Sequence, residues 1–278
     1  MKSSLTSTII KKTICFIAFA MFLLPFVIMI IGSFKPALAL NLIPLDLSPF
    51  RNLTFDNYER LASSVNMARA FRNSLYIVTF VVSIEVALGI TTGYVFAKKD
   101  FPCKRILFVL VIITMMLPRQ LLLIPNFMVA KTLGLMDSLT GVALTTINAS
   151  YGIFLTRQRV LTIPNDYYEA AKLDGCNDFQ VFGHIIFPQL KPTMAAIAIY
   201  SMFGVWNDYL WQYIMLTSPK NQTIPVLLAY VANGNTSGVP ATGMQLAGSV
   251  VALIPVLTFF FVFQKWFIEG TGDGAMKE

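Results

Sequence analysis

The sequence has 278 residues, of which 56% are hydrophobic and 13% are charged, whereas a soluble domain averages roughly 45–50% apolar and 25% charged residues. This composition excludes an ordinary soluble globular protein and indicates a chain whose solvent is a lipid bilayer. The net charge of +7 does not indicate nucleic-acid binding, because the 21 basic residues are scattered between long apolar runs.

Six windows are long and apolar enough to cross a bilayer as helices, which takes about 20 residues. They cover residues 13–33, 73–97, 106–130, 139–156, 193–217 and 242–264. We therefore predict an all-α integral membrane protein in which residues 1–278 form a single transmembrane domain of six helices. A secretory signal cleaved near residues 37–39 is an alternative for the first window, but that window exceeds the usual apolar run of a signal, about 7–15 residues.

The orientation follows from the positive charges, because cytoplasmic loops of membrane proteins are enriched in Lys and Arg. With the N-terminus inside, most of the 21 basic residues fall on the inner side, including those of loops 98–105 and 157–191. We therefore predict that both termini and these two loops are cytoplasmic. The long outer loop 35–72 holds most of the remaining basic residues.

The inner loop between the fourth and fifth windows is predicted to form a pair of short helices. Pro164 and Asn165 can start and cap the first helix, Glu169 suits its positive N-terminal end, and Gly175 can end it in a left-handed conformation. A second helix is expected from about 177 to 186. On these grounds alone, a solvated connector is the simpler interpretation of the segment.

The spacing of residues in segment 164–188 resembles the EAA loop of the permease subunits of binding-protein-dependent ABC importers. The order is Glu169-Ala170-Ala171, three residues, Gly175, nine residues, Ile185, one residue, and Phe187-Pro188. Phe187 departs from the Leu that usually precedes this proline. The pair Asp174-Gly175 is similar to the carbohydrate-importing branch, of which the second permease of maltose-type and multiple-sugar importers is the familiar example.

Other segments carry the same resemblance, which covers nearly the whole chain. They are Ser33 to Pro36, Asn52 to Tyr58, Met116 to Pro118 and Trp206 to Leu210. The resemblance implies that a short cytoplasmic coupling helix pair between spans four and five inserts into a separate ATPase. It assigns this coupling role to Glu169, Ala170, Ala171, Asp174 and Gly175, with the small alanines permitting close approach of the partner.

The resemblance also implies the function and the partners. The chain would form the solute path for a sugar by alternating access, in a bacterial-type cytoplasmic (inner) membrane. Its partners would be a second homologous permease in a heterodimer, a nucleotide-binding ATPase dimer and an extracytoplasmic solute-binding protein. ATP and Mg are expected on the ATPase and no cofactor on this chain, which has no G-x-x-x-x-G-K-[ST] phosphate loop. The chain is therefore not expected to be an enzyme by itself.

Two alternatives stay open at this point. Glycerol phosphate is another cargo found in the same branch of importers. An ion-coupled secondary transporter, which belongs to a different class, would use buried carboxylates such as Glu85 and Asp208 as coupling sites. The EAA spacing argues against the second alternative.

The sequence contains few cysteines and histidines that could form a metal site or a hydrolase site. Cys15, Cys103 and Cys176 lie far apart and form no C-x-x-C pair, so we expect free thiols. His184 is the one histidine and cannot supply a His-rich metal site or a Ser-His-Asp triad. We predict neither a catalytic residue nor a metal site.

Two charges fall at the middle of predicted spans. At helical rise, Glu85 and Arg119 lie roughly 18 and 20 Å from the inner ends of their windows. A charge at that depth costs about 2.5–3.5 kcal/mol on insertion scales. We expect Glu85 and Arg119 to face one another or a shared aqueous cavity, either as a stabilising pair or as part of the substrate path.

The fifth window offers polar and aromatic side chains in its outer half. Asn207, Asp208, Trp211 and Gln212 are candidates for the substrate path, and the last three share a helix face by their i, i+3 and i+4 spacing. An aromatic ring beside a carboxylate and an amide suits a sugar. The alternative is an aromatic belt that anchors the helix at headgroup level.

Overall fold

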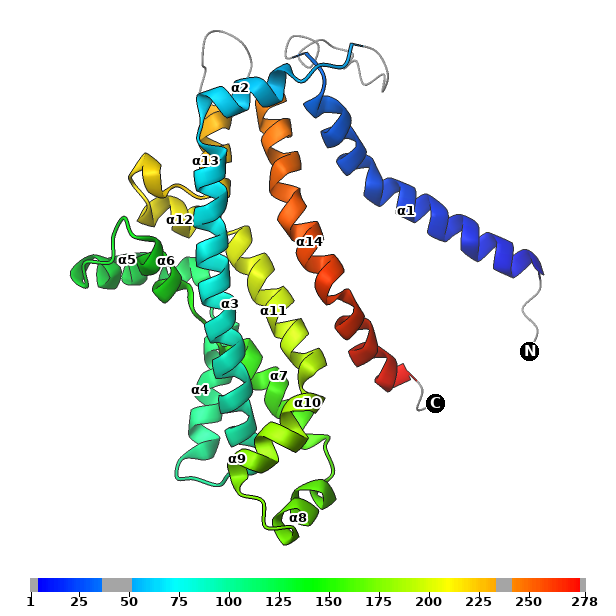
Figure 1. The fold of residues 1–278 in the computed structure, drawn as a ribbon, viewed down its shortest axis with the longest axis vertical. Helices are drawn as coiled ribbons and strands as arrows, with labels where there is room; N and C mark the ends of the chain where they lie inside the picture. The colour runs from blue at the N-terminus through cyan, green and yellow to red at the C-terminus, as the bar shows by residue number, and fades with distance from the viewer. Residues whose placement is uncertain (1–4, 37–51, 234–241, 276–278) are drawn as a thin grey trace. The chain divides into compact units, whose positions relative to one another are not determined.

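The structure is a computed structural model that describes residues 5–36, 52–233 and 242–275, with side chains for 9–36, 52–233 and 242–265. Every regular element of this described part is a helix (Figure 1). The all-α prediction is therefore confirmed. The helices belong to two compact units, Met1–Met67 with Leu227–Ile254 and Ala68–Val226 with Pro255–Glu278. The alternative signal cleavage site at residues 37–39 lies outside the described residues.

Three single helices of the described chain are long and apolar enough to cross a membrane. They are α1 (Leu5–Ser33), α3 (Met67–Lys98) and α14 (Thr242–Ala275). Two bent helix pairs raise the number to five if each pair is one span. The first joins α4 (Lys104–Met116) to η2 (Arg119–Leu122) and α5 (Leu123–Thr132) with a 97° bend, and the second joins α6 (Leu139–Thr146) to α7 (Ser150–Leu161) with a 45° bend.

Three predicted windows are therefore interrupted in the structure. Window 106–130 breaks at Pro118, which lacks a backbone N–H and keeps the preceding residue extended. Window 139–156 breaks between α6 and α7. Window 193–217 breaks between α11 (Lys191–Trp206) and α12 (Tyr209–Met215). An apolar window cannot reveal such breaks, because the few residues that form them hardly change its average hydropathy.

The structure also contains helices that the sequence did not predict. Helix α2 (Asp56–Ser64) lies between the first and second windows, and α13 (Ile224–Asn233) lies between the fifth and sixth windows. A short 3-10 helix, η4 (Pro219–Asn221), precedes α13. All three are too short to cross a membrane, so a search for apolar windows of about 20 residues passes over them.

In the first unit, one buried amide holds the end of α1. The Asn57 side chain donates to the backbone carbonyls of Ser33, at 2.9 Å, and Lys35, at 2.7 Å. The Ser33 carbonyl is one of the last carbonyls of α1, which have no acceptor role inside the helix, so the amide satisfies it where α1 stops. A small core of Leu61, Val231, Met244 and Ala247 packs beside this anchor within the same unit.

In the second unit, α3 packs closely on α7 through residues with small side chains. A Cβ atom at Gly89 would lie 3.0 Å from the Cα of Gly152, and one at Gly93 would lie 2.6 Å from the Cβ of Thr156. The two α3 glycines are four residues apart, the small-xxx-small spacing that lets membrane helices approach. The close approach matters because α7 leads directly into the segment 164–188.

We expect Gly93→Ala to destabilise the protein, because the new methyl group would overlap Thr156. Overpacking of this kind costs about 1–3 kcal/mol. Gly204→Ala in α11 is the matched control, since a Cβ there meets nothing within 4 Å, and alanine in a helix is favoured over glycine by up to about 1 kcal/mol. Thermal unfolding in detergent measures both changes. Equal melting temperatures for the two variants would contradict the packing described here.

Candidate functional site

The first helix of segment 164–188 is α8 (Asn165–Leu173), and it ends as the sequence predicts. Gly175 has a φ of +82°, a left-handed conformation that glycine adopts without steric cost. The N–H of Cys176 donates to the carbonyl of Ala171 (2.9 Å), and the N–H of Gly175 donates to that of Lys172 (3.1 Å). These two bonds form a Schellman motif and fix the angle at which the chain leaves α8.

The start of α8 differs from the prediction. Pro164 occupies the N-cap position without a side-chain cap, and Asn165 is already inside the helix. The Asn165 side-chain oxygen instead accepts a hydrogen bond from the Lys98 ammonium group (2.6 Å). Asn165 therefore ties α8 to the C-terminal end of α3 rather than capping its own helix.

The second predicted helix begins at α9 (Asp178–Val181), which Asn177 caps. The Asn177 side chain accepts from the N–H of Gln180 (2.9 Å), and the Gln180 side chain accepts from the N–H of Asn177 (2.8 Å), a complete capping box. The helix continues as a π-helix, η3 (Phe182–Ile186), and as α10 (Phe187–Gln189). A widened turn precedes Pro188, whose ring disfavours regular α-helix packing against the preceding turn.

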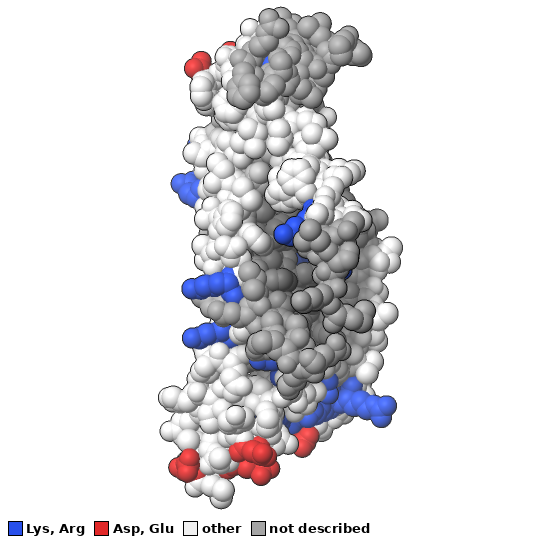
Figure 2. Space-filling model, turned by 90° about the vertical axis from the view of Figure 1, so that its right-hand side faces the viewer, with Lys and Arg blue, Asp and Glu red and all other residues white. Residues whose placement is uncertain are grey.

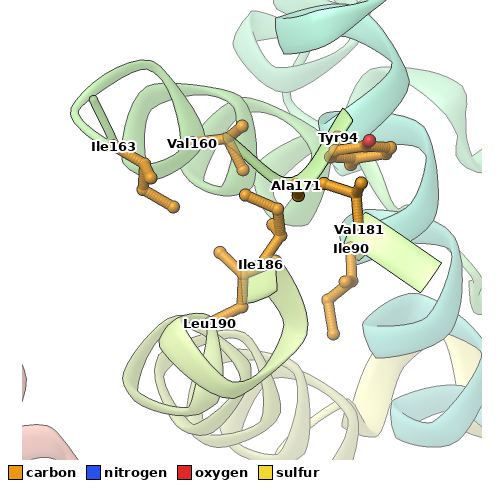
Figure 3. Close-up of a cluster of buried hydrophobic side chains, with 8 residues drawn as sticks. All are labelled: Ile90, Tyr94, Val160, Ile163, Ala171, Val181, Ile186 and Leu190. Atoms are coloured by element: carbon orange, nitrogen blue, oxygen red, sulfur yellow. The ribbon is translucent and has the colours of Figure 1, made fainter. Parts of the chain in front are cut away.

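An apolar cluster, here called the coupling core, joins both short helices to α3 and α7 (Figure 3). It consists of Ile90, Tyr94, Val160, Ile163, Ala171, Val181, Ile186 and Leu190. A fully buried aliphatic side chain contributes about 1.5–3 kcal/mol. The coupling core therefore makes segment 164–188 a folded extension of the two longer helices, not a solvated connector.

Ala171 belongs to the coupling core and is only 5% exposed. We expected both alanines of the pair to permit close approach of a partner. The structure places Ala170 on the exposed face of α8 and Ala171 on its inner face. The small side chain of Ala171 therefore permits α8 to pack on its own chain.

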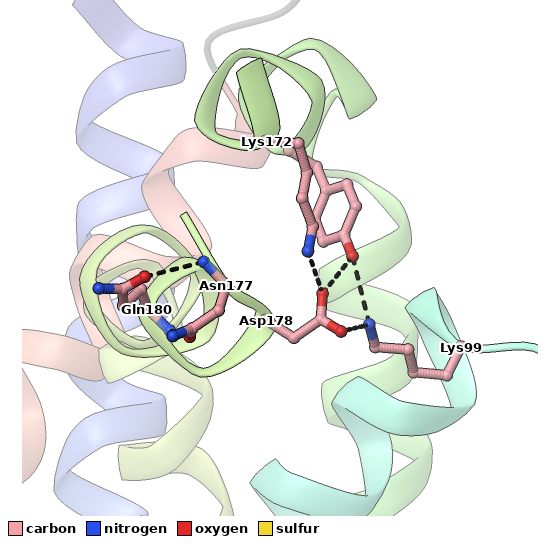
Figure 4. A network of polar contacts seen from close by, with 6 residues as sticks. Lys99, Lys172, Asn177, Asp178 and Gln180 are labelled. Carbon is pink, nitrogen blue, oxygen red and sulfur yellow. Dashed lines mark hydrogen bonds and ion pairs between the residues drawn. The ribbon is translucent and has the colours of Figure 1, made fainter. Parts of the chain in front are cut away.

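A polar network holds the same helices together at Asp178 (Figure 4). Its carboxylate pairs with the ammonium groups of Lys99 at 2.5 Å and Lys172 at 2.8 Å, and it accepts a hydrogen bond from the Tyr168 hydroxyl at 2.6 Å. Lys99 also donates to the Tyr168 hydroxyl at 3.2 Å. The network thus connects the residue that follows α3 with both α8 and α9.

The charges of this network persist over a wide pH range. Hydrogen bonds from Lys172, and then from Lys99 and Tyr168, hold the pKa of Asp178 well below its usual value. Burial on its own would lower the pKa of Lys99, but hydrogen bonds with Asp178 and Tyr168 outweigh it and raise the pKa. The Asp178 carboxylate and the Lys99 ammonium group therefore both stay ionised at neutral pH.

The outer face of the helix pair combines acidic and apolar side chains. Glu169 and Asp174 are exposed, and acidic side chains gather at the end of the second unit that carries α8 (Figures 1 and 2). Leu173 is 89% exposed and Phe179 is 88% exposed. Large apolar side chains uncovered on a polar segment mark an interaction surface. We call Glu169, Ala170, Leu173 and Phe179 the docking face.

The sequence prediction missed Leu173 and Phe179, and the signal for Leu173 depends on knowing which face of α8 is buried. Leu173 lies two residues from Ala171, which is about 200° around a helix. If Ala171 faces the protein interior, Leu173 must face outward. Phe179 offered no comparable signal, because α9 is too short to define a face.

Glu85 and Arg119 lie at the same break, although among the described side chains they form no ion pair with each other. The Glu85 carboxylate accepts a hydrogen bond from the backbone N–H of Asn148 at 2.6 Å. The Arg119 guanidinium donates to the backbone carbonyl of Thr146 at 2.6 Å. Both side chains therefore bind the same segment, the connection between α6 and α7.

The candidates of the fifth window do not form one open face. Asp208 is the N-cap of α12 and accepts from the N–H of Trp211 at 3.3 Å. Trp211 and Gln212 are buried, and their side chains donate to the Thr145 hydroxyl and to the Val205 carbonyl, respectively.

The remaining polar group of Gln212, its side-chain oxygen, accepts a hydrogen bond from Thr223. Asn207 is exposed, and its amide donates to the carbonyl of Phe203 at 2.9 Å. Gln212 thus ties α12 to α11 across the break, and Trp211 ties α12 to α6. Of the four candidates, Asn207 and Asp208 stay at least partly exposed.

We expect Asp178→Asn to loosen the helix pair, because Lys99 and Lys172 lose their shared carboxylate. Hydrogen exchange of the amides in 165–181 should become faster at neutral pH. Asp100→Asn is the control, since its ion pair with Lys104 involves a fully exposed carboxylate. Equal exchange in the two variants would contradict a structural role for Asp178.

The pH dependence of hydrogen exchange in 165–181 follows from the pKa shifts of Asp178 and Lys99. The lowered pKa of Asp178 gives stability above the unfolded value of about 3.9 that is lost as the pH falls. The raised pKa of Lys99 gives stability below about 10.4 that is lost as the pH rises. After correction for intrinsic rates, exchange in 165–181 should therefore be constant between about pH 5 and 9. A titration step inside that window would contradict the network.

Comparison with protein families gives one match that covers two thirds of the chain. Residues 86–271 match the model of the binding-protein-dependent transport system inner membrane component. The arabinooligosaccharides transport system permease protein AraQ of Bacillus subtilis is 35% identical over 92% of this chain and 91% of its own length. A probable starch degradation products transport system permease protein, AmyC of Thermoanaerobacterium thermosulfurigenes, is 30% identical over 91% of each chain.

A solved structure has the same fold. It is the crystal structure of a bacterial ABC transporter involved in the import of the acidic polysaccharide alginate. One chain of it matches with a TM-score of 0.83, at 22% identity, over 96% of this chain and 98% of the other. At this level of identity, the match establishes the fold alone.

Proposed function

Because the chain belongs to the family of binding-protein-dependent transport system inner membrane components, we propose that it forms the solute path of an ATP-driven sugar importer. It is a multi-pass membrane permease and not an enzyme, and ATP is hydrolysed by a partner ATPase. A solute-binding protein completes the set of partners that the family implies. The observation that carries the proposal is the docking face. It belongs to a helix pair that the coupling core joins to α3 and α7, and its apolar side chains are exposed in the isolated chain.

The docking face is proposed to bind the ATPase and to receive its movement. Leu173 and Phe179 would enter an apolar cleft of the partner, and Glu169 would engage it through charge. Gly175 sets the angle between the two short helices, and the exposed Asp174 lies beside it. Because the coupling core joins these helices to α3 and α7, a displacement of the docking face would move both helices.

The cargo is proposed to be an oligosaccharide. The two relatives named above are permeases for arabinooligosaccharides and for products of starch degradation. The glycerol-phosphate alternative is not favoured, because Arg119, the cation at mid-span, is engaged by the carbonyl of Thr146. Asn207 and Asp208 are the residues of the fifth window that would contact the sugar.

The proposed assembly has six spans, with both termini in the cytoplasm and segment 164–188 between spans four and five. Each bent pair counts as one span, and α11 with α12 forms the fifth. A second homologous permease would complete the path as a heterodimer in a bacterial cytoplasmic membrane. ATP and Mg would bind to the ATPase dimer, with no cofactor on this chain. The ion-coupled alternative has less support, because Glu85 is engaged by a backbone N–H.

We expect Leu173→Ser and Phe179→Ser each to weaken binding of the partner ATPase at least tenfold. Each removes an apolar side chain whose burial at an interface is worth about 1.5–3 kcal/mol, and about 1.4 kcal/mol corresponds to a factor of ten. Glu169→Lys should weaken binding as well. Copurification of the ATPase with the permease, followed by titration in detergent, measures the effect.

The control for these variants is Leu161→Ser, since Leu161 is also exposed but lies at the end of α7, outside the docking face. It should leave ATPase binding unchanged. If Leu173→Ser and Phe179→Ser bind the ATPase as tightly as Leu161→Ser does, the proposed docking face is wrong.

A further inference from the structure

The break between α6 and α7 exposes backbone groups inside a predicted span. Helix α6 ends at Thr146, α7 begins at Ser150, and the two axes differ by 45°. In hydrocarbon, each backbone group freed by such a break needs a partner from the protein. The break can therefore persist only where side chains from neighbouring elements reach it.

Two charged side chains, one from α3 and one from η2, reach this break. Glu85 of α3 is 7% exposed and binds the N–H of Asn148, just before α7 begins. Arg119 of η2 binds the carbonyl of Thr146, the last residue of α6. The anion lies at a helix N-terminus and the cation at a helix C-terminus, so each charge also complements a helix dipole.

Further contacts fix the start of α7 against its neighbours. The side-chain oxygen of Asn148 accepts from the N–H of Ser150 (3.2 Å) and from its hydroxyl (2.6 Å). The Ser150 hydroxyl also shares a hydrogen bond with the hydroxyl of Thr114 of α4 (2.7 Å). One turn after Glu85, the backbones of Gly89 and Gly152 are close enough that neither position has room for a larger side chain.

We propose that Glu85 and Arg119 are positioning residues that stiffen the bend between α6 and α7, and that neither contacts the solute. Helix α7 leads directly into the coupling core through Val160 and Ile163. A movement of the docking face therefore displaces α7 first. Helix α6 moves with α7 only if the angle between the two helices stays fixed. The inference rests on the proposed function for its role in transport, but the bend itself can be measured independently.

The experiment is a distance measurement by double electron–electron resonance on the assembled importer in nanodiscs. Spin labels are placed at Leu144 of α6 and Gln158 of α7, which are both exposed, after Cys15, Cys103 and Cys176 are replaced by Ser. With Glu85 and Arg119 unchanged, the two labels should give a single narrow distance distribution. Uptake of arabinotriose into proteoliposomes is measured in parallel.

Glu85→Ala and Arg119→Ala should each broaden the distribution about twofold or more, because a freed backbone group lets the two helices reorient. Glu85→Gln retains a hydrogen-bond acceptor and Arg119→Lys retains a cationic donor, so both should keep the narrow distribution and most of the uptake. Arg105→Ala, an exposed arginine of α4, is the control and should change neither readout.

A narrow distribution in Glu85→Ala and Arg119→Ala would overturn the inference, and combined with lost uptake it would point to direct solute contact. If an alanine variant does not assemble, Glu85→Gln and Arg119→Lys still test the inference. Loss of uptake in both of these variants, with an unchanged distance distribution, would also overturn the inference. Absence of arabinotriose uptake by the unmodified importer would count against the proposed cargo and leave the distance result intact.

Discussion

A backbone N–H or carbonyl that leaves a helix within the hydrocarbon must find a partner inside the protein. This constraint accounts for the contacts of several polar side chains in the described spans. Glu85 and Arg119 bind the two sides of the break between α6 and α7, while Gln212 of α12 binds the Val205 carbonyl of α11 across the break between those two helices. Residues that look like a solute site in the sequence are largely occupied in keeping interrupted helices folded.

Segment 164–188, which we propose to be cytoplasmic, obeys a different constraint, because water can satisfy its backbone. Here the apolar coupling core and the ion pairs of Asp178 supply the rigidity. Surface ion pairs taken singly contribute little, but a carboxylate shared by two ammonium groups and a hydroxyl fixes the positions of three elements. The segment is thus anchored where it joins α3 and α7, and its outward face combines acidic and exposed apolar side chains, which suits the proposed transmission of a movement.

Much of this could be predicted from the sequence. The helical class follows from the apolar windows, and the turn at Gly175 follows from the conformational freedom of glycine. The breaks in the spans could not be predicted from hydropathy. Nor could the inward orientation of Ala171, because it depends on which face of α8 meets Tyr94 and Val181. Glu85 and Arg119 both reach the break between α6 and α7, but their partners there are backbone groups of a segment that no charge pattern marks.

The most direct test of the central claim is uptake by the reconstituted importer. This chain, its companion permease, the ATPase and the solute-binding protein are placed in proteoliposomes with labelled arabinooligosaccharide. The account predicts that uptake requires ATP and all of these proteins, and that proton or sodium gradients do not replace ATP. Gradient-driven uptake by this chain alone would contradict it.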